Sequence, residues 1–73
     1  MYSLTEPGNV QIVIYDHLGR KIATLLDEHQ DAGSYSLNWD GTDDGGEKLS
    51  AGVYFLNFTT GEYREAARVV ILR

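Results

Sequence analysis

Residues 39–54 read WDGTDDGGEKLSAGVY, and the rest of the chain is organised around them. The stretch joins the only tryptophan, Trp39, to an acidic, glycine-rich turn and then to an aromatic β-type run that includes Tyr54. Both rings fall on apolar faces at strand spacing, and small β-sandwiches rely on a buried tryptophan. We therefore expect Trp39 and Tyr54 in the core of an all-β domain, with the Tyr54 hydroxyl bonded to a neighbouring backbone group.

Length and composition narrow the classes of protein that this chain can be. Its 73 residues make one small domain, and a chain of this size has little room for the walled pocket of an enzyme. No serine or threonine lies in a nucleophile-elbow context. The net charge of −5 argues against binding to nucleic acid, and no apolar run reaches the roughly 20 residues that span a bilayer. The sequence has no cysteine, which excludes disulfides and zinc–thiolate sites. We expect a non-catalytic domain.

Alternating apolar and polar residues predict β-strands at four places, with a short strand fragment over residues 2–5. The four predicted strands cover residues 10–15, 34–39, 53–60 and 63–72. The side chains expected on the apolar faces of the first and third of these are Val10, Ile12 and Ile14, and Tyr54, Leu56 and Phe58.

Turn signals rich in glycine, proline and aspartate separate these segments about every 8–12 residues. The turns are expected at residues 6–9, 16–19, 40–46, 50–52 and 60–62, and a short strand is expected at 47–49. The glycines expected to have structural roles are Gly19, Gly33, Gly41 and Gly52, with Gly19 in a left-handed conformation. The pattern indicates six or seven short antiparallel strands in a small sandwich or barrel.

Residues 20–30 are ambiguous. Leu18, Ile22, Leu25, Leu26 and His29 follow a helical spacing, and the segment is rich in good helix formers. Local physics alone favours one helix that ends at Gly33. A bulged strand over residues 21–27 is the competing interpretation, because a bulge shifts the alternation by one residue.

Several of these pieces together resemble the FlgD Ig-like family and the similar C-terminal sorting domains of type IX secretion. The matching pieces are LTEPGNV at 4–10, IYD at 14–16 with GR at 19–20, AGSY at 32–35, WDGTDD at 39–44, GVY at 52–54 and RVVILR at 68–73. They span almost the whole chain in the expected order, and the series is more specific than any single piece. The resemblance implies an immunoglobulin-like β-sandwich and favours the bulged strand over the helix at residues 20–30.

The same resemblance implies a function. Such domains usually form the C-terminal module of large secreted enzymes and surface proteins, where they act as an export address or a surface-attachment module. The flagellar hook-capping relatives share the fold but serve assembly. We therefore expect residues 1–73 to be one Ig-like module of a larger secreted or cell-surface bacterial protein, with export or assembly machinery as its partner.

The chain departs from the family pattern before Tyr2, where the family normally carries another strand that often opens with an Asn-Pro pair. The expected consequence is an exposed strand edge through which two copies can associate.

The acidic turn is the obvious place to look for a metal ion. Asp40, Asp43 and Asp44 cluster there, and calcium prefers six to eight oxygen ligands. In an EF-hand loop starting at Asp40, however, Ala51 occupies the position that needs a bidentate glutamate. The alternative is a set of turns in which the aspartates accept hydrogen bonds from backbone N–H groups. We expect no cofactor, and the three aspartates are weak candidates for calcium.

The residue types of two further binding functions are present, sugar stacking and metal binding by histidine. Trp39 and Tyr54 have the residue types of a sugar-stacking platform, but their strand spacing favours the core. His17 and His29 lie far apart with no metal-ligand spacing, so we expect both at the surface. An accessory carbohydrate- or calcium-binding module is therefore the third hypothesis, after sorting or attachment and after assembly.

Overall fold

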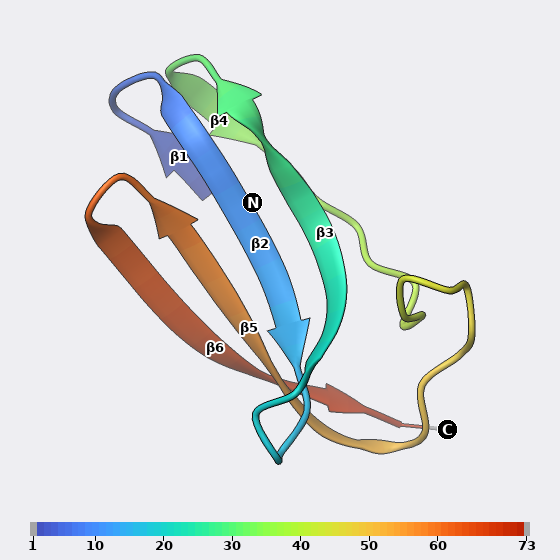
Figure 1. The fold of residues 1–73 in the computed structure, drawn as a ribbon. Coiled ribbons are helices and arrows are strands. Elements are labelled where there is room, and N and C mark those ends of the chain that lie inside the picture. The colour runs from blue at the N-terminus through green and yellow to red at the C-terminus, as the bar shows by residue number, and fades with distance from the viewer. Residues whose placement is uncertain (1, 73) are drawn as a thin grey trace.

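The computed structural model describes residues 2–72, and in that range the chain forms six β-strands and no helix (Figure 1). The strands are β1 (Tyr2–Leu4), β2 (Gly8–Tyr15), β3 (Lys21–Gln30), β4 (Gly33–Tyr35), β5 (Gly52–Thr60) and β6 (Tyr63–Ile71). No helix of the described residues is long and apolar enough to cross a membrane.

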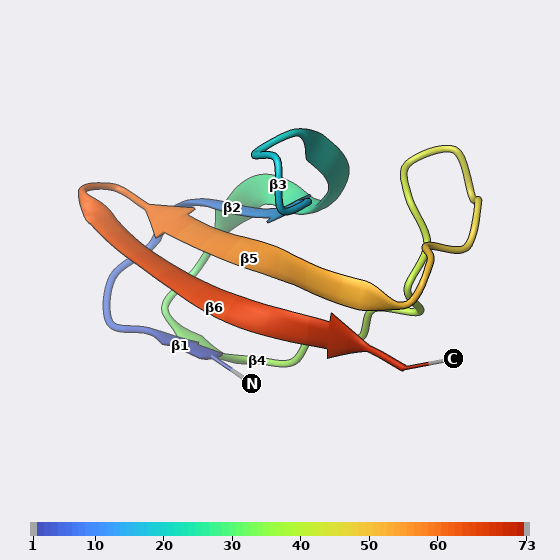
Figure 2. The same cartoon turned by 90° about the horizontal axis from the view of Figure 1, so that it is seen from below.

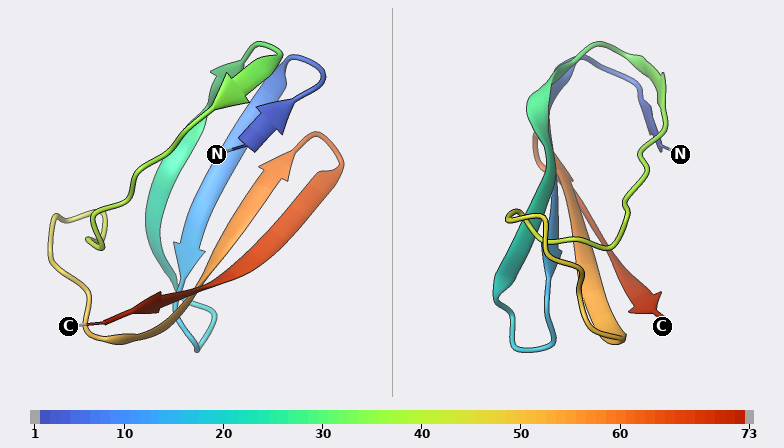
Figure 3. Two further views of the ribbon diagram at one scale, coloured as in Figure 1. Left: turned by 180° about the vertical axis from the view of Figure 1, so that it is seen from behind. Right: turned by 90° about the vertical axis from the view of Figure 1, so that its right-hand side faces the viewer.

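The strands form two antiparallel sheets. The larger sheet has the order β3-β2-β5-β6, and the smaller one pairs β1 with β4. Figure 2 shows the small sheet lying on one side of the large sheet. The right-hand view of Figure 3 shows the chain after β4 running along that same side at first and then crossing to a loop beside β3. The predicted small all-β sandwich of about six or seven antiparallel strands is confirmed, with six strands among the described residues.

Residues 21–30 form a strand with two irregularities, so the helical interpretation of this segment is wrong. Ile12 lies opposite Leu26 and Val13 opposite Thr24, which leaves Leu25 as an extra residue. A second shift of the register leaves Ile22 without a partner residue on β2, because Ile14 lies opposite Ala23 and Tyr15 lies opposite Lys21. Each bulge moves the alternation by one residue, which is how Ile22, Leu25 and Leu26 acquire a helix-like spacing.

Three predicted boundaries are wrong in detail. The turn expected over residues 6–9 ends early, because Gly8 and Asn9 already pair in β2. The short strand expected over residues 47–49 is only an isolated bridge between Thr42 and Lys48. Residues 36–39 alternate as predicted but continue β4 without ladder pairing, because the small sheet ends at Tyr35.

The core lies on the inner face of the large sheet and consists of two neighbouring clusters. Leu4, Val10 and Ile12 form the first, and Ile14, Ala23 and Tyr54 form the second. The small sheet covers the first, and Trp39 and Leu49, from the segment between β4 and β5, pack against the second. Val10, Ile12 and Ile14 share the buried face of β2, as the alternation predicts, and Leu56 and Phe58 of β5 pack against the same clusters. Burying one side chain of this size stabilises a fold by about 1.5–3 kcal/mol.

Candidate functional site

The acidic turn is built from carboxylates that accept hydrogen bonds from the chain itself. Asp40 Oδ1 accepts from the amide (3.2 Å) and hydroxyl (2.6 Å) of Thr42. Asp43 Oδ1 accepts from the amides of Gly45 (2.9 Å) and Glu47 (3.0 Å). The hydroxyl of Thr42 stabilises the ionised form of Asp40 and holds the pKa of that carboxyl below its ordinary value.

Asp44 connects this turn to β3, the edge strand of the large sheet. Its amide donates to the carbonyl of Ile22 (3.3 Å), and its Oδ1 accepts from the amide of Thr24 (2.9 Å). A bulge leaves backbone groups without ladder partners, and an edge strand leaves one side of its backbone open. Asp44 therefore covers the outer side of β3 where that strand is irregular.

The three aspartates thus face different backbone groups. A cavity of about 450 Å³ between the turn and β3 is lined by all three and by Trp39. Among residues 2–72, no three histidine, cysteine, aspartate or glutamate side chains are grouped so that they could hold a metal ion. His17 and His29 are both exposed, the first in the turn after β2 and the second near the end of β3.

Trp39 is half-buried rather than fully enclosed. Its ring packs against the cluster of Ile14, Ala23 and Tyr54, and its Nε1 donates to the carbonyl of Thr42 (2.9 Å). Gly41, between them, has a positive φ of 78°, which turns the chain back toward the ring. The indole therefore joins the acidic turn to the core and does not lie flat on the surface as a stacking platform.

Tyr54 forms the expected bond to the backbone: its hydroxyl donates to the carbonyl of Ser50 (2.8 Å). Tyr35 makes the same contact with the carbonyl of Asp31 (2.5 Å). Each tyrosine follows Ala-Gly-x, and the two glycines, Gly33 and Gly52, have φ values of 151° and 155°, which side chains disfavour. Sequence reasoning predicted the corner at Tyr54 but missed the one at Tyr35, although the repeated Ala-Gly-x-Tyr pattern was visible.

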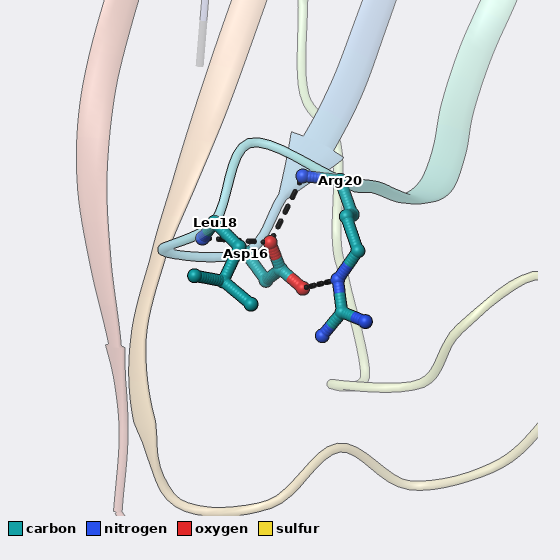
Figure 4. Close-up of polar contacts among 3 residues, drawn as sticks. All are labelled: Asp16, Leu18 and Arg20. Atoms are coloured by element: carbon teal, nitrogen blue, oxygen red, sulfur yellow. Dashed lines mark hydrogen bonds and ion pairs between the residues drawn. The ribbon is translucent and has the colours of Figure 1, made fainter.

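A second feature missed as a site is the buried carboxylate of Asp16 in the turn between β2 and β3 (Figure 4). Asp16 Oδ1 accepts from the amides of Leu18 and Arg20 (both 2.9 Å), and Oδ2 accepts from Arg20 Nε (2.8 Å). The Arg20 amide, assisted by the guanidinium, lowers the pKa of Asp16. Gly19 has a φ of 80°, so its predicted left-handed conformation is confirmed. The sequence signal that could have revealed this turn is an aspartate, Asp16, followed three and four residues later by Gly19 and Arg20.

The outward face of the β5–β6 hairpin carries several exposed apolar side chains. Val53 and Phe55 on β5 are 40% and 38% exposed, and Val70 on β6 is 53% exposed. Cross-strand pairing places Phe55 opposite Arg68 and Val53 opposite Val70. This hairpin face, defined by Val53, Phe55, Arg64, Ala66, Arg68 and Val70, combines apolar side chains with two of the six basic residues of an acidic chain.

Fold and local contacts together define a small two-layer antiparallel sandwich whose polar residues mainly fix turns and whose last hairpin is exposed. The family model of the FlgD Ig-like domain matches residues 1–62, most of the chain. The chain therefore belongs to the FlgD Ig-like domain family. No curated protein and no solved structure gives a significant match.

Proposed function

We propose that this chain is a non-catalytic docking module that marks or anchors a larger secreted bacterial protein. Its exposed hairpin face would contact outer-membrane export machinery of the type IX kind. The observation that carries the proposal is the outward face of β5–β6, where Val53, Phe55 and Val70 are each about half exposed, close to arginines. Exposed apolar residues gathered on one face are typical of a protein-contact surface.

The edge of the large sheet supports the same proposal. β6 is nine residues long, pairs only with β5 among the described strands, and ends the sheet. Main-chain pairing with a partner strand would need little sequence specificity, which suits a module that is attached to different cargo proteins. The proposed location is therefore the cell surface or the medium.

The non-catalytic part of the proposal rests on the use of the polar side chains. Asp16, Asp40, Asp43 and Asp44 each accept hydrogen bonds from the chain's own backbone. Carboxylates used in this way hold turns in place, which supports a structural role for them.

A fusion tests the sorting role. The chain is joined to the C-terminus of a reporter enzyme that carries a signal peptide, in a bacterium with type IX export, and the reporter is assayed in medium, envelope and periplasm. The proposal predicts that the reporter leaves the periplasm only when the domain is attached. A reporter that stays periplasmic with an intact domain overturns the sorting role.

Assembly is the second candidate. The match to the FlgD Ig-like domain favours it, because the flagellar hook-capping relatives of this fold serve assembly. In this reading the module is a scaffold in a surface structure and associates through the open edge of β6. Sedimentation over a range of concentrations tests it. Concentration-dependent association supports the scaffold, and a monomer throughout argues against self-association.

A further inference from the structure

The two arginines of the hairpin face lie in line along β6. Arg64 and Arg68 are four positions apart on one strand, so their side chains leave the same face of the sheet, with Ala66 between them. A strand rises about 3.3 Å per residue, which places the two positions about 13 Å apart. Both arginines are exposed, and neither forms an ion pair with any residue in the range 2–72. The hairpin face therefore presents two guanidinium groups to solvent at a fixed spacing.

No acidic side chain of the described residues of β5 and β6 lies on this face. The positions that alternate on it are 53, 55, 57 and 59 of β5 and 64, 66, 68 and 70 of β6, and none of them is aspartate or glutamate. Glu62 lies in the turn between the strands, and Glu65 lies on the opposite, inward face of β6. The chain has a net charge of −5, yet this face carries positive charge and attracts anionic groups.

Apolar side chains adjoin Arg68 on the same face. Phe55 lies directly opposite Arg68, and Tyr15 lies opposite Phe55 on the next strand, β2. Val53 and Val70 form the neighbouring exposed pair on β5 and β6. Residues directly opposite each other on one face of an antiparallel sheet are neighbours. A partner side chain that is apolar could therefore cover Phe55 and Val70 while a carboxylate beside it binds the guanidinium of Arg68.

We propose that the hairpin face binds an acidic, extended segment of a partner protein. Two carboxylates of this segment, four residues apart, meet Arg64 and Arg68, and an apolar side chain two positions further along covers Phe55 and Val70. Alternate residues of an extended segment point the same way, so carboxylates at this separation repeat the spacing of the two arginines. The inference rests on the proposed docking function and names the chemistry of the partner at that site.

Charge argues against two other occupants of this face. A second copy of the chain docked through the same face would bring its own two arginines against Arg64 and Arg68, and like charges at an interface repel. Anionic lipid surfaces are recognised by clusters of about four to eight basic residues. The hairpin face has two, and the net charge of −5 would oppose the approach of the whole chain to such a surface.

The test titrates the complete, isotope-labelled chain with the peptide acetyl-GESASESWG-amide, whose glutamates are four residues apart, and follows binding by NMR. The proposal predicts saturable shifts of amide signals from residues 53–55 and 64–70. A peptide of the same composition with adjacent glutamates, acetyl-GSAEESSWG-amide, is expected to bind about threefold more weakly, and acetyl-GKSASKSWG-amide about tenfold more weakly. Absence of saturable shifts overturns the proposal, and so does either altered peptide that binds as tightly as the first.

Matched variants of the chain locate the peptide. Arg64→Ala and Arg68→Ala, both at exposed positions, are each expected to weaken binding about fivefold, because each removes one guanidinium from the face. Lys21→Ala removes one positive charge from an exposed position on β3, at the other edge of the large sheet, and should leave binding unchanged. If Lys21→Ala weakens binding as much as the arginine variants do, the peptide responds to net charge alone and the proposal is overturned.

Two sedimentation measurements examine the other occupants. The proposal predicts that the chain does not sediment with phosphatidylglycerol vesicles, and vesicle binding that Arg68→Ala abolishes would overturn it in favour of lipid. A dimer of the free chain that the peptide dissociates would assign the face to a second copy and overturn it as well. The titration does not depend on export: fusions that stay periplasmic although the chain binds the peptide refute the sorting role alone, and export without peptide binding refutes the acidic segment alone.

Discussion

Single side chains in this domain act mainly by bonding to turns. Asp16, Asp43 and Tyr54 each connect to backbone groups within four residues of themselves. Such contacts fix turns that glycine would otherwise leave flexible, which matters in a chain with a small core. At this scale the sequence was informative about Gly19 and about the Tyr54 hydroxyl, because both follow from local chemistry.

Tyr54→Phe tests the second of the two tyrosine corners. The variant keeps the ring in the core and removes the bond to the carbonyl of Ser50, so we expect a loss of about 1 kcal/mol in the free energy of unfolding. Urea denaturation measures it. Tyr63→Phe is the matched control, because its hydroxyl contacts only the exposed Glu65 side chain, and it should lose less. Equal losses would contradict the corner.

The lowered pKa of Asp16 predicts that the domain loses stability in acid. Its pKa is lowered in the folded state below the ordinary value of 3.8, so its contribution to stability is full above that value. The contribution falls as the pH drops below 3.8 and through the lower folded pKa. Asp16→Asn should therefore cost more stability at about pH 6 than at about pH 3. A cost that is the same at the two pH values would contradict the proposed role of the charge.

At the scale of elements, the structure of β3 could not be predicted from local sequence. Helix propensity and spacing favoured a helix over residues 20–30, and nothing local reveals the bulges at Ile22 and Leu25. Pairing with β2 and the contact with Asp44, twenty positions beyond Thr24, stabilise the strand instead. β5 and its turn at Gly61 were predictable because strict alternation and a glycine turn are themselves local.

Asp44→Ala tests the contact that covers β3. The amide of Thr24 would lose its acceptor, so we expect its hydrogen exchange to accelerate and the free energy of unfolding to fall by about 1 kcal/mol. Amide exchange by NMR measures the first effect and urea denaturation the second. Glu47→Ala, in the same loop but with no such side-chain contact to β3, is the control. Unchanged exchange at Thr24 would show that the Asp44 side chain does not stabilise β3.

At the scale of the whole molecule, the two layers are unequal. A four-stranded sheet faces a two-stranded one, so the inner face of β5–β6 is only partly covered (Figure 2). The outer face of β5–β6 is exposed, because the small sheet lies on the other side of the large sheet. The sandwich and its alternating faces could be predicted from the sequence. The exposure of the hairpin face could not, because it depends on which side of the large sheet the small sheet covers.

The central claim is that the outward face of β5–β6 meets the partner of this module. The most direct measurement is export of a reporter fused to one of two matched variants, each shown by circular dichroism to be folded. Arg68→Glu reverses a charge on the hairpin face, and Lys21→Glu makes the same change on the opposite edge strand. The account predicts that Arg68→Glu reduces export and Lys21→Glu does not. Equal export of the two folded variants would contradict it.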